Sequence, residues 1–137
     1  MRTVVAALVL VSGCIISKDE CNETGKTDSD QLAAVQPGIE VRASLSGCST
    51  CGHAKAIGTW TPPSDLVVTG SIEVTLAPVC PVQDTTLAVA PSAGMAVADN
   101  NHRNCGDVVD YDGFIKNNSN VVIPMMEIKL TCCTLGE

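Results

Sequence analysis

Apolar and polar residues alternate along several short segments of the chain after residue 38. Between residues 39 and 45, every second position is apolar and the positions between are polar or charged. Between residues 66 and 76, every second position is apolar except for Gly70, where a bulge or bend is expected. Residues 126–133 alternate in the same way near the C-terminus. Because a period of two is typical of strands with one buried face, we expect strands over these three segments.

Two shorter segments, 85–90 and 95–98, predict further strands, and the turn-forming residues 91–94 between them predict a hairpin. No amphipathic helix pattern occurs after Gly38. Short strands separated by Pro, Gly and Asn turns predict an all-β fold, a single antiparallel β-sandwich roughly immunoglobulin-like in size and stabilised by disulfides. We expect this domain to cover residues 39–137, although alternation does not fix its topology.

The segment before the predicted strands is polar and acidic. Residues 17–38 contain five acidic residues and two lysines among Asn, Thr, Ser and Gly. Low hydrophobicity combined with net charge is typical of a chain that buries too little surface to order itself. We therefore expect residues 14–38 to form a flexible tether in front of the sandwich domain.

The first fourteen residues, MRTVVAALVLVSGC, have the features of an export signal. Arg2 is the one charge before Lys18, and residues 4–11 form an apolar run too short for a membrane span. Residues 10–13 then place apolar and small side chains directly before Cys14, and this run resembles the lipobox of bacterial lipoproteins. The resemblance implies a signal peptide at residues 1–13, lipidation of Cys14 with palmitate among its acyl chains, and attachment to the lipid bilayer of the cell envelope.

Two alternatives to a lipoprotein stay open. An ordinary secretory signal cut at the same bond would release a secreted protein with a plain thiol at Cys14, and the apolar run could instead be a core strand. If the chain is lipidated, Ile15 and Ile16 carry no acidic retention signal, so we expect the outer membrane rather than the inner one.

The charge balance argues against one class of partner. The chain has eight Lys and Arg residues against fifteen Asp and Glu residues, which gives a formal net charge of −7. Such a surface repels nucleic acid, and no basic cluster offsets it. We therefore expect no nucleic-acid partner.

Eight cysteines could crosslink a core that has only three aromatic residues. If Cys14 is lipidated, Cys21 is the expected odd thiol; if not, the two could pair. The other cysteines are candidates for disulfides within the β domain: Cys48, Cys51, Cys80, Cys105, Cys132 and Cys133. Cys132 and Cys133 are adjacent on a predicted strand, so we expect them to take different partners.

Two metal sites are conceivable, each with a simpler interpretation. Cys48 and Cys51 form a CxxC pair, which could be redox-active or, with His102 and Cys105, could hold zinc; a turn held by two half-cystines gives the same pattern. We expect the two histidines, His53 and His102, to be surface residues in loops.

The second candidate is a calcium site. Three acids around a DxDG step are its candidate ligands: Asp107, Asp110 and Asp112. Asx turns between strands would have the same composition without an ion.

The sequence lacks a nucleophile motif and a complete cofactor fingerprint, so we expect no catalytic residues and no cofactor. We interpret the chain as a non-enzymatic binding or structural module of the cell envelope with a surface or envelope protein as partner. Polar loops at 99–107 and 110–120 are the expected contact surface. An open sheet edge that docks a partner strand, and an exported thiol or hydrolytic enzyme, are the alternatives.

Overall fold

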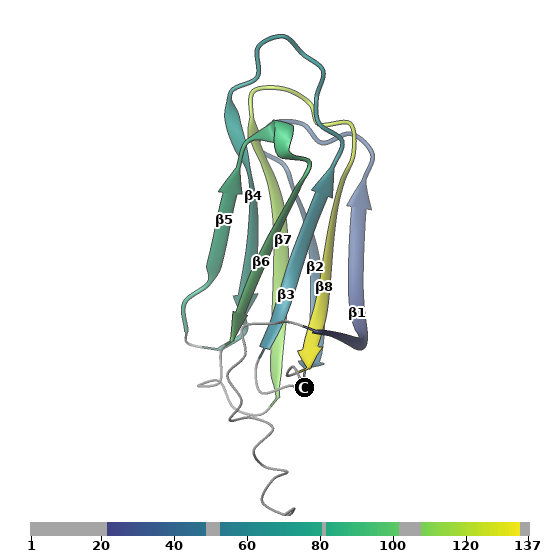
Figure 1. Cartoon of the computed structure of the whole chain (residues 1–137), viewed down its shortest axis with the longest axis vertical. Helices are drawn as coiled ribbons and strands as arrows, with labels where there is room; N and C mark the ends of the chain where they lie inside the picture. Colours follow the sequence, from purple (N-terminus) through teal and green to yellow (C-terminus); the bar gives the residue numbers. More distant parts are fainter. Residues whose placement is uncertain (1–21, 49–52, 81, 102–107, 135–137) are drawn as a thin grey trace, which may run out of the picture.

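The computed structural model describes residues 22–48, 53–80, 82–101 and 108–134. Within these ranges the chain forms eight strands and one short 3₁₀ turn (Figure 1). Their bounds are β1 Asn22–Leu32, β2 Glu40–Cys48, β3 His53–Trp60, β4 Gly70–Pro78, β5 Thr85–Val89, η1 Pro91–Ala93, β6 Met95–Asn101, β7 Val109–Ser119 and β8 Met126–Thr134.

The strands form two four-stranded antiparallel sheets that pack face to face. The first sheet has the order β1-β8-β3-β6, and the second has the order β2-β7-β4-β5. This order, in which the chain crosses repeatedly from one sheet to the other, is that of an eight-stranded jelly roll. The prediction of a single antiparallel β-sandwich is therefore confirmed, and the topology is the part that alternation left open.

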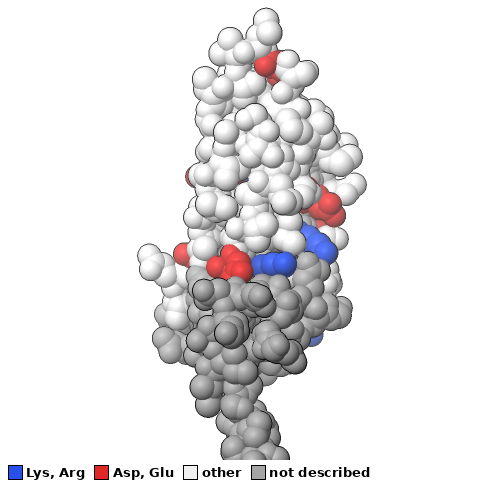
Figure 2. All heavy atoms as spheres, viewed as in Figure 1, with Lys and Arg blue, Asp and Glu red and all other residues white. Residues whose placement is uncertain are grey.

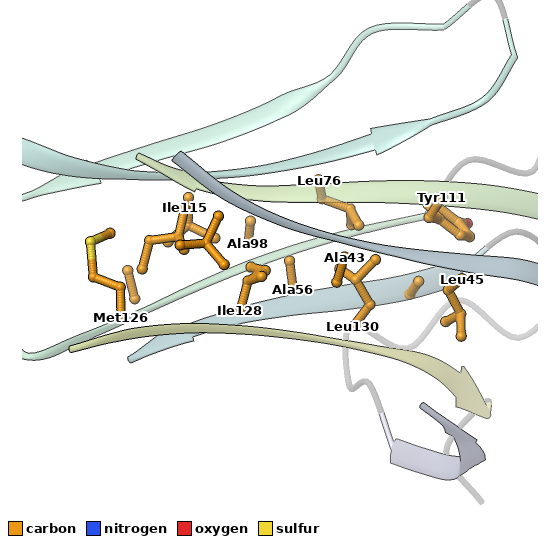
Figure 3. Close-up of a cluster of buried hydrophobic side chains, with 14 of the residues drawn as sticks. Ala43, Leu45, Ala56, Leu76, Ala98, Tyr111, Ile115, Met126, Ile128 and Leu130 are labelled. Carbon is orange, nitrogen blue, oxygen red and sulfur yellow. The ribbon is translucent and has the colours of Figure 1, made fainter. Parts of the chain in front are cut away.

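Aliphatic side chains from both sheets fill the space between them (Figure 3). On β4, Ile72, Val74 and Leu76 are fully buried, as their parity predicts. On β8, the inward residues include Ile128 and Leu130, which are also fully buried. Hydrophobic burial on these inner faces is the main favourable term that holds the two sheets together.

The N-terminal side of the domain differs from the tether expected there. Residues 22–32 form β1, which pairs with β8 from Asn22↔Thr134 to Leu32↔Met126. The described side chains of β1, residues 26–32, are all exposed. An exposed edge strand needs no apolar face, because backbone pairing with β8 holds it, so hydrophobicity could not reveal it. The sandwich therefore includes residues 22–32, ahead of the start expected at residue 39.

Three other expectations need correction. β4 begins at Gly70, so residues 66–69 lie in a loop and not in a strand. β5 and β6 do not form a hairpin, because they belong to different sheets; η1 and Gly94, at φ +78°, carry the chain from one sheet to the other. Residues 110–120 are not a loop, since β7 covers nearly all of them as a central strand.

A disulfide joins the two sheets. Cys48 at the end of β2 bonds Cys132 near the end of β8, with 5.6 Å between their Cα atoms. Cys80 and Cys133 are also disulfide-bonded, so none of the cysteines in the described ranges is a free thiol. Cys132 and Cys133 are thus not bonded to each other. The sandwich is therefore crosslinked across its core.

Candidate functional site: the loop end

The two ends of the sandwich differ in what they carry. At one end lie the start of β1, the end of β8 and all four described cysteines. At the other end four connections come together, residues 33–39, 61–69, 90–94 and 120–125 (Figure 1). We call these four connections the loop end.

The loop end is apolar and almost free of charge. Its four connections contain one charged residue, Asp65, although the chain as a whole is acidic. Figure 2 shows the same contrast. On the face in view, the charged side chains lie away from the loop end, which is at the top, apart from one acidic group. Large exposed hydrophobic residues lie in three of the connections: Ile39, Leu66, Val67, Val122 and Met125. Exposed apolar residues gathered in one place, unlike scattered ones, are typical of interaction sites.

The longest of these connections, residues 61–69, projects beyond the sandwich (Figure 1). Leu66 is fully exposed and Val67 is 70% exposed. Asn120 holds the base of this loop: its Oδ1 accepts from the Thr69 amide at 2.8 Å, and its Nδ2 donates to the Val67 carbonyl at 3.3 Å. The two apolar side chains are thus presented by a loop that is tied to the β7–β8 connection.

A buried polar network holds the neighbouring loop. Asn117, fully buried on the inner face of β7, donates to the carbonyls of Val35 at 2.8 Å and Val121 at 2.9 Å. Its Oδ1 accepts from the amide and the hydroxyl of Ser119 at 2.9 and 2.6 Å. Val35 also exchanges both backbone hydrogen bonds with Ile123. The network therefore fixes two of the loop-end connections to each other and to the core.

The outer face of the second sheet is polar and carries the one aromatic side chain that is not buried. The Arg42 guanidinium lies 4.9 Å from the centre of the Phe114 ring and 4.0 Å from an Asp112 carboxylate oxygen. Arg42 therefore occupies the ring face on which a planar or sugar ligand would stack. The other aromatic residues of the chain, Trp60 and Tyr111, are buried.

The calcium candidates fall on this face. Asp110 and Asp112 lie on β7, where Asp110 accepts from the Gly47 amide at 2.6 Å and Asp112 accepts from the Ser44 hydroxyl at 2.7 Å. They are strand residues that tie β7 to β2, not the turn residues that the composition suggested. Asp107 lies outside the described residues.

Of the zinc and redox candidates, the structure describes only Cys48. Cys48 is in a disulfide, and Cys51, His102 and Cys105 lie outside the described residues, as do Cys14 and Cys21. Across the described ranges, no group of three or more His, Cys, Asp or Glu side chains is placed to hold a metal ion. The same ranges contain no helix with the length and hydropathy of a membrane span.

His53 corrects another expectation. It was expected on the surface but is 2% exposed on β3, where its Nε2 lies 3.1 Å from an Asp99 carboxylate oxygen. A His–Asp pair is a familiar part of hydrolytic sites, yet a general base must reach the substrate and this imidazole is enclosed. The structure brings the pair together without opening it to a ligand.

Of the two loops expected to form the contact surface, one is a strand. Strand β7 covers nearly all of the loop predicted at 110–120. Of the loop predicted at 99–107, residues 99–101 are the end of β6 and residues 102–107 lie outside the described residues. The signal that could have located the loop end is the sequence TPPSDLVVT, where two prolines precede three adjacent apolar residues. Prolines oppose a continuous strand, so the apolar residues after them lie in a loop.

No protein-family model matches the chain, and no curated protein is significantly similar to it. Solved structures resemble it at low identity. The vertex protein P5 of PRD1 is 9% identical, with a TM-score of 0.43 over 80% of this chain and 97% of that one. The Yersinia pseudotuberculosis-derived mitogen is 12% identical, with a TM-score of 0.45 over 81% and 89% of the two chains. A mannan-recognising carbohydrate-binding module, TmCBM27, is 12% identical, with a TM-score of 0.45 over 76% and 72%.

Proposed function

We propose that the chain is a membrane-anchored, non-enzymatic binding module of the cell envelope, and that the loop end contacts a protein partner. The observation that carries this proposal is the tied loop 61–69, which presents Leu66 and Val67 to solvent at an end of the sandwich where Asp65 is the one charged residue of the four connections. Burial of such side chains in a partner is favourable by about 1.5–3 kcal/mol each. Leaving them in water gives the chain itself no stability.

Polarity and charge favour a protein partner over a lipid surface. Side chains that insert into the membrane interface are commonly accompanied by Trp, Tyr, Lys or Arg, and the four loop-end connections contain none of these. The net charge of −7 adds repulsion from anionic head groups. An apolar surface with a single charged residue, Asp65, matches the centre of a protein–protein interface, where charged residues are depleted.

A glycan is a weaker candidate, although carbohydrate-binding modules are among the structures that share this fold. Sugar recognition relies on exposed aromatic rings for stacking, and the chain has three aromatic residues in all. Two of them are buried, and Arg42 covers the third, Phe114.

The anchor is proposed from the lipobox-like run that ends at Cys14. Asn22, the first described residue, lies at the end of the sandwich opposite the loop end. An anchor ahead of it would direct the loop end away from the membrane. Cys14→Ala is expected to move the protein from the membrane fraction to the soluble one, and intact-mass measurement would show the loss of the acyl chains. An unmodified Cys14 in soluble wild-type protein would refute the anchor without touching the loop-end proposal.

The binding role is tested with a tagged full chain captured from its native envelope. The double variant Leu66→Ser/Val67→Ser is compared with Val108→Ser, which alters an apolar residue at the other end that is 60% exposed. Partner recovery should fall at least about tenfold in the loop variant, as expected for the loss of a little over 1.4 kcal/mol, and should persist in the control. Equal recovery from both variants, or binding of the wild type to neutral lipid vesicles in place of a protein, would overturn the proposal.

A further inference from the structure

The edge strands of the two sheets differ in how their outward amide groups are covered. β1 and β2 lie on one side of the sandwich, and aspartates cap both of them. Asp30 accepts from the Gln31 amide at 2.9 Å, and Asp28 accepts from the Ser44 amide of β2 at 3.1 Å. These bonds occupy donors that an added strand would need, and the carboxylates repel another acidic chain. Charge and local capping are common protections of sheet edges.

On the opposite side, β6 lacks such capping among the described residues. The Trp60 amide donates to the Gly94 carbonyl at 3.0 Å, which makes these two a hydrogen-bonded pair. Because antiparallel pairs alternate, the next pair, Thr59↔Met95, and the pair Ile57↔Val97 are non-hydrogen-bonded. The amide and carbonyl groups of Met95 and Val97 therefore point away from β3, off the edge of the first sheet.

The side chains along this edge are apolar. Met95 is 56% and Val97 is 39% exposed, and Ile57 lies beside Val97 on the same outer face. The acidic residue of β6, Asp99, does not protect the edge, because its carboxylate lies against His53 of β3.

The neighbouring edge strand, β5, differs from β6 in length. It has five residues, and shortness is itself a protection against edge pairing. β6 is thus the one edge among the described strands that is seven or more residues long and without an aspartate cap.

We propose that β6 pairs edge to edge, in antiparallel orientation, with β6 of a second copy of this chain. An antiparallel edge is its own complement, so a two-fold axis near Val97 satisfies both open edges at once and leaves neither exposed. The pairing places the apolar Ile57–Val97 row of one copy next to that of the other across a continuous eight-stranded sheet. It also keeps the capped, acidic edges of both copies on the outside. Pairing through a single seven-residue strand buries little area, so the dimer is weak. The proposal is independent of the loop end.

A covalent trap suits a weak complex. A photoreactive amino acid is placed at Met95 of the full chain in its native envelope, and crosslinked product at twice the chain mass is quantified after illumination. Val97→Pro removes the outward amide without removing a bond to β3, whereas Val97→Thr keeps the amide and the β-branched shape. Dimer yield is expected to fall at least about tenfold with proline and to stay at the wild-type level with threonine.

Position 108, at the far end, serves as the crosslinking control and should yield no dimer. If the proline variant loses its wild-type protease resistance, Val97→Lys replaces it; lysine keeps the β3 ladder, sets like charges against each other across the axis, and should cause the same loss. The proposal is overturned by absence of a dimer from Met95, by a crosslink to a different protein, or by dimer yields that neither Val97→Pro nor Val97→Lys lowers.

Discussion

Replacement of Asn117 by alanine is expected to destabilise the domain by about 2.5–6 kcal/mol, because the side chain makes four hydrogen bonds in a fully buried position. After truncation, the Val35 carbonyl keeps the Ile123 amide, and the Val121 carbonyl keeps the Ser119 hydroxyl at 3.0 Å. The Ser119 amide loses its acceptor, which costs about 1–3 kcal/mol for a stranded buried donor. The three other lost bonds add about 0.5–1 kcal/mol each, since their partners are in part compensated.

The assay is denaturant unfolding under oxidising conditions, followed by the fluorescence of Trp60, the one tryptophan of the chain. Asn118→Ala is the matched control, because this neighbour points to the outer face; its effect should stay within about 0.5 kcal/mol. Ser119→Ala combined with Asn117→Ala should cost less than the sum of the single changes, since both belong to one network. A loss below about 1 kcal/mol for Asn117→Ala would refute the assignment of a stabilising role to this network.

Three further predictions concern the core and the crosslink. Burial raises the pKa of Tyr111, so this one tyrosine should show no phenolate absorbance until the protein unfolds; stability should fall as pH rises above about 10, where the unfolded chain ionises first. A phenolate signal from still-folded protein near pH 10 would contradict this. Gly70→Ala should cost more than about 2 kcal/mol in thermal unfolding, because residue 70 has φ +90° and a Cβ there would collide with the Asn118 carbonyl; a change within about 0.5 kcal/mol would show that the strand start adjusts freely. Cys48→Ala/Cys132→Ala should lower stability by up to about 4.5 kcal/mol, the loop-closure value for a separation of 84 residues, and an unchanged unfolding midpoint would count against this bond.

Alternation predicted strands that have a buried face and a regular pattern, whereas β5 and β6 were predicted as short segments on either side of turn-forming residues. β2, β4 and β8 alternate because one face of each packs in the core. β7 also alternates in burial, but Gly113, Asn117 and Ser119 stand at inward positions, so its pattern does not read as apolar. The described side chains of β1, residues 26–32, include no buried one that a pattern could detect. Alternation therefore reports burial of a strand face, and edge or polar-lined strands escape it.

The candidate site could be predicted only as a class. Composition argues against nucleic acid and favours loops as the contact surface, yet which loops project depends on strand order, which no local pattern encodes. Residues 66–69 were assigned to a strand because their parity matches that of β4. The structure separates them at Gly70, whose positive φ no other residue adopts without strain. Leu66, which the strand prediction places in the core, therefore lies in an exposed loop.

The account depends most on the loop end as the binding surface, and a photoreactive amino acid at position 66 tests this directly. In its native envelope, the full chain should give a discrete crosslinked product with one protein from position 66 and none from position 108. The same product should disappear when Val67→Ser is added. In a separate sample with the photoreactive amino acid at position 95, Val67→Ser should leave the crosslinked β6 dimer unaffected. Absence of any crosslink from position 66, or an identical pattern from both positions, would contradict the claim that the loop end binds a partner.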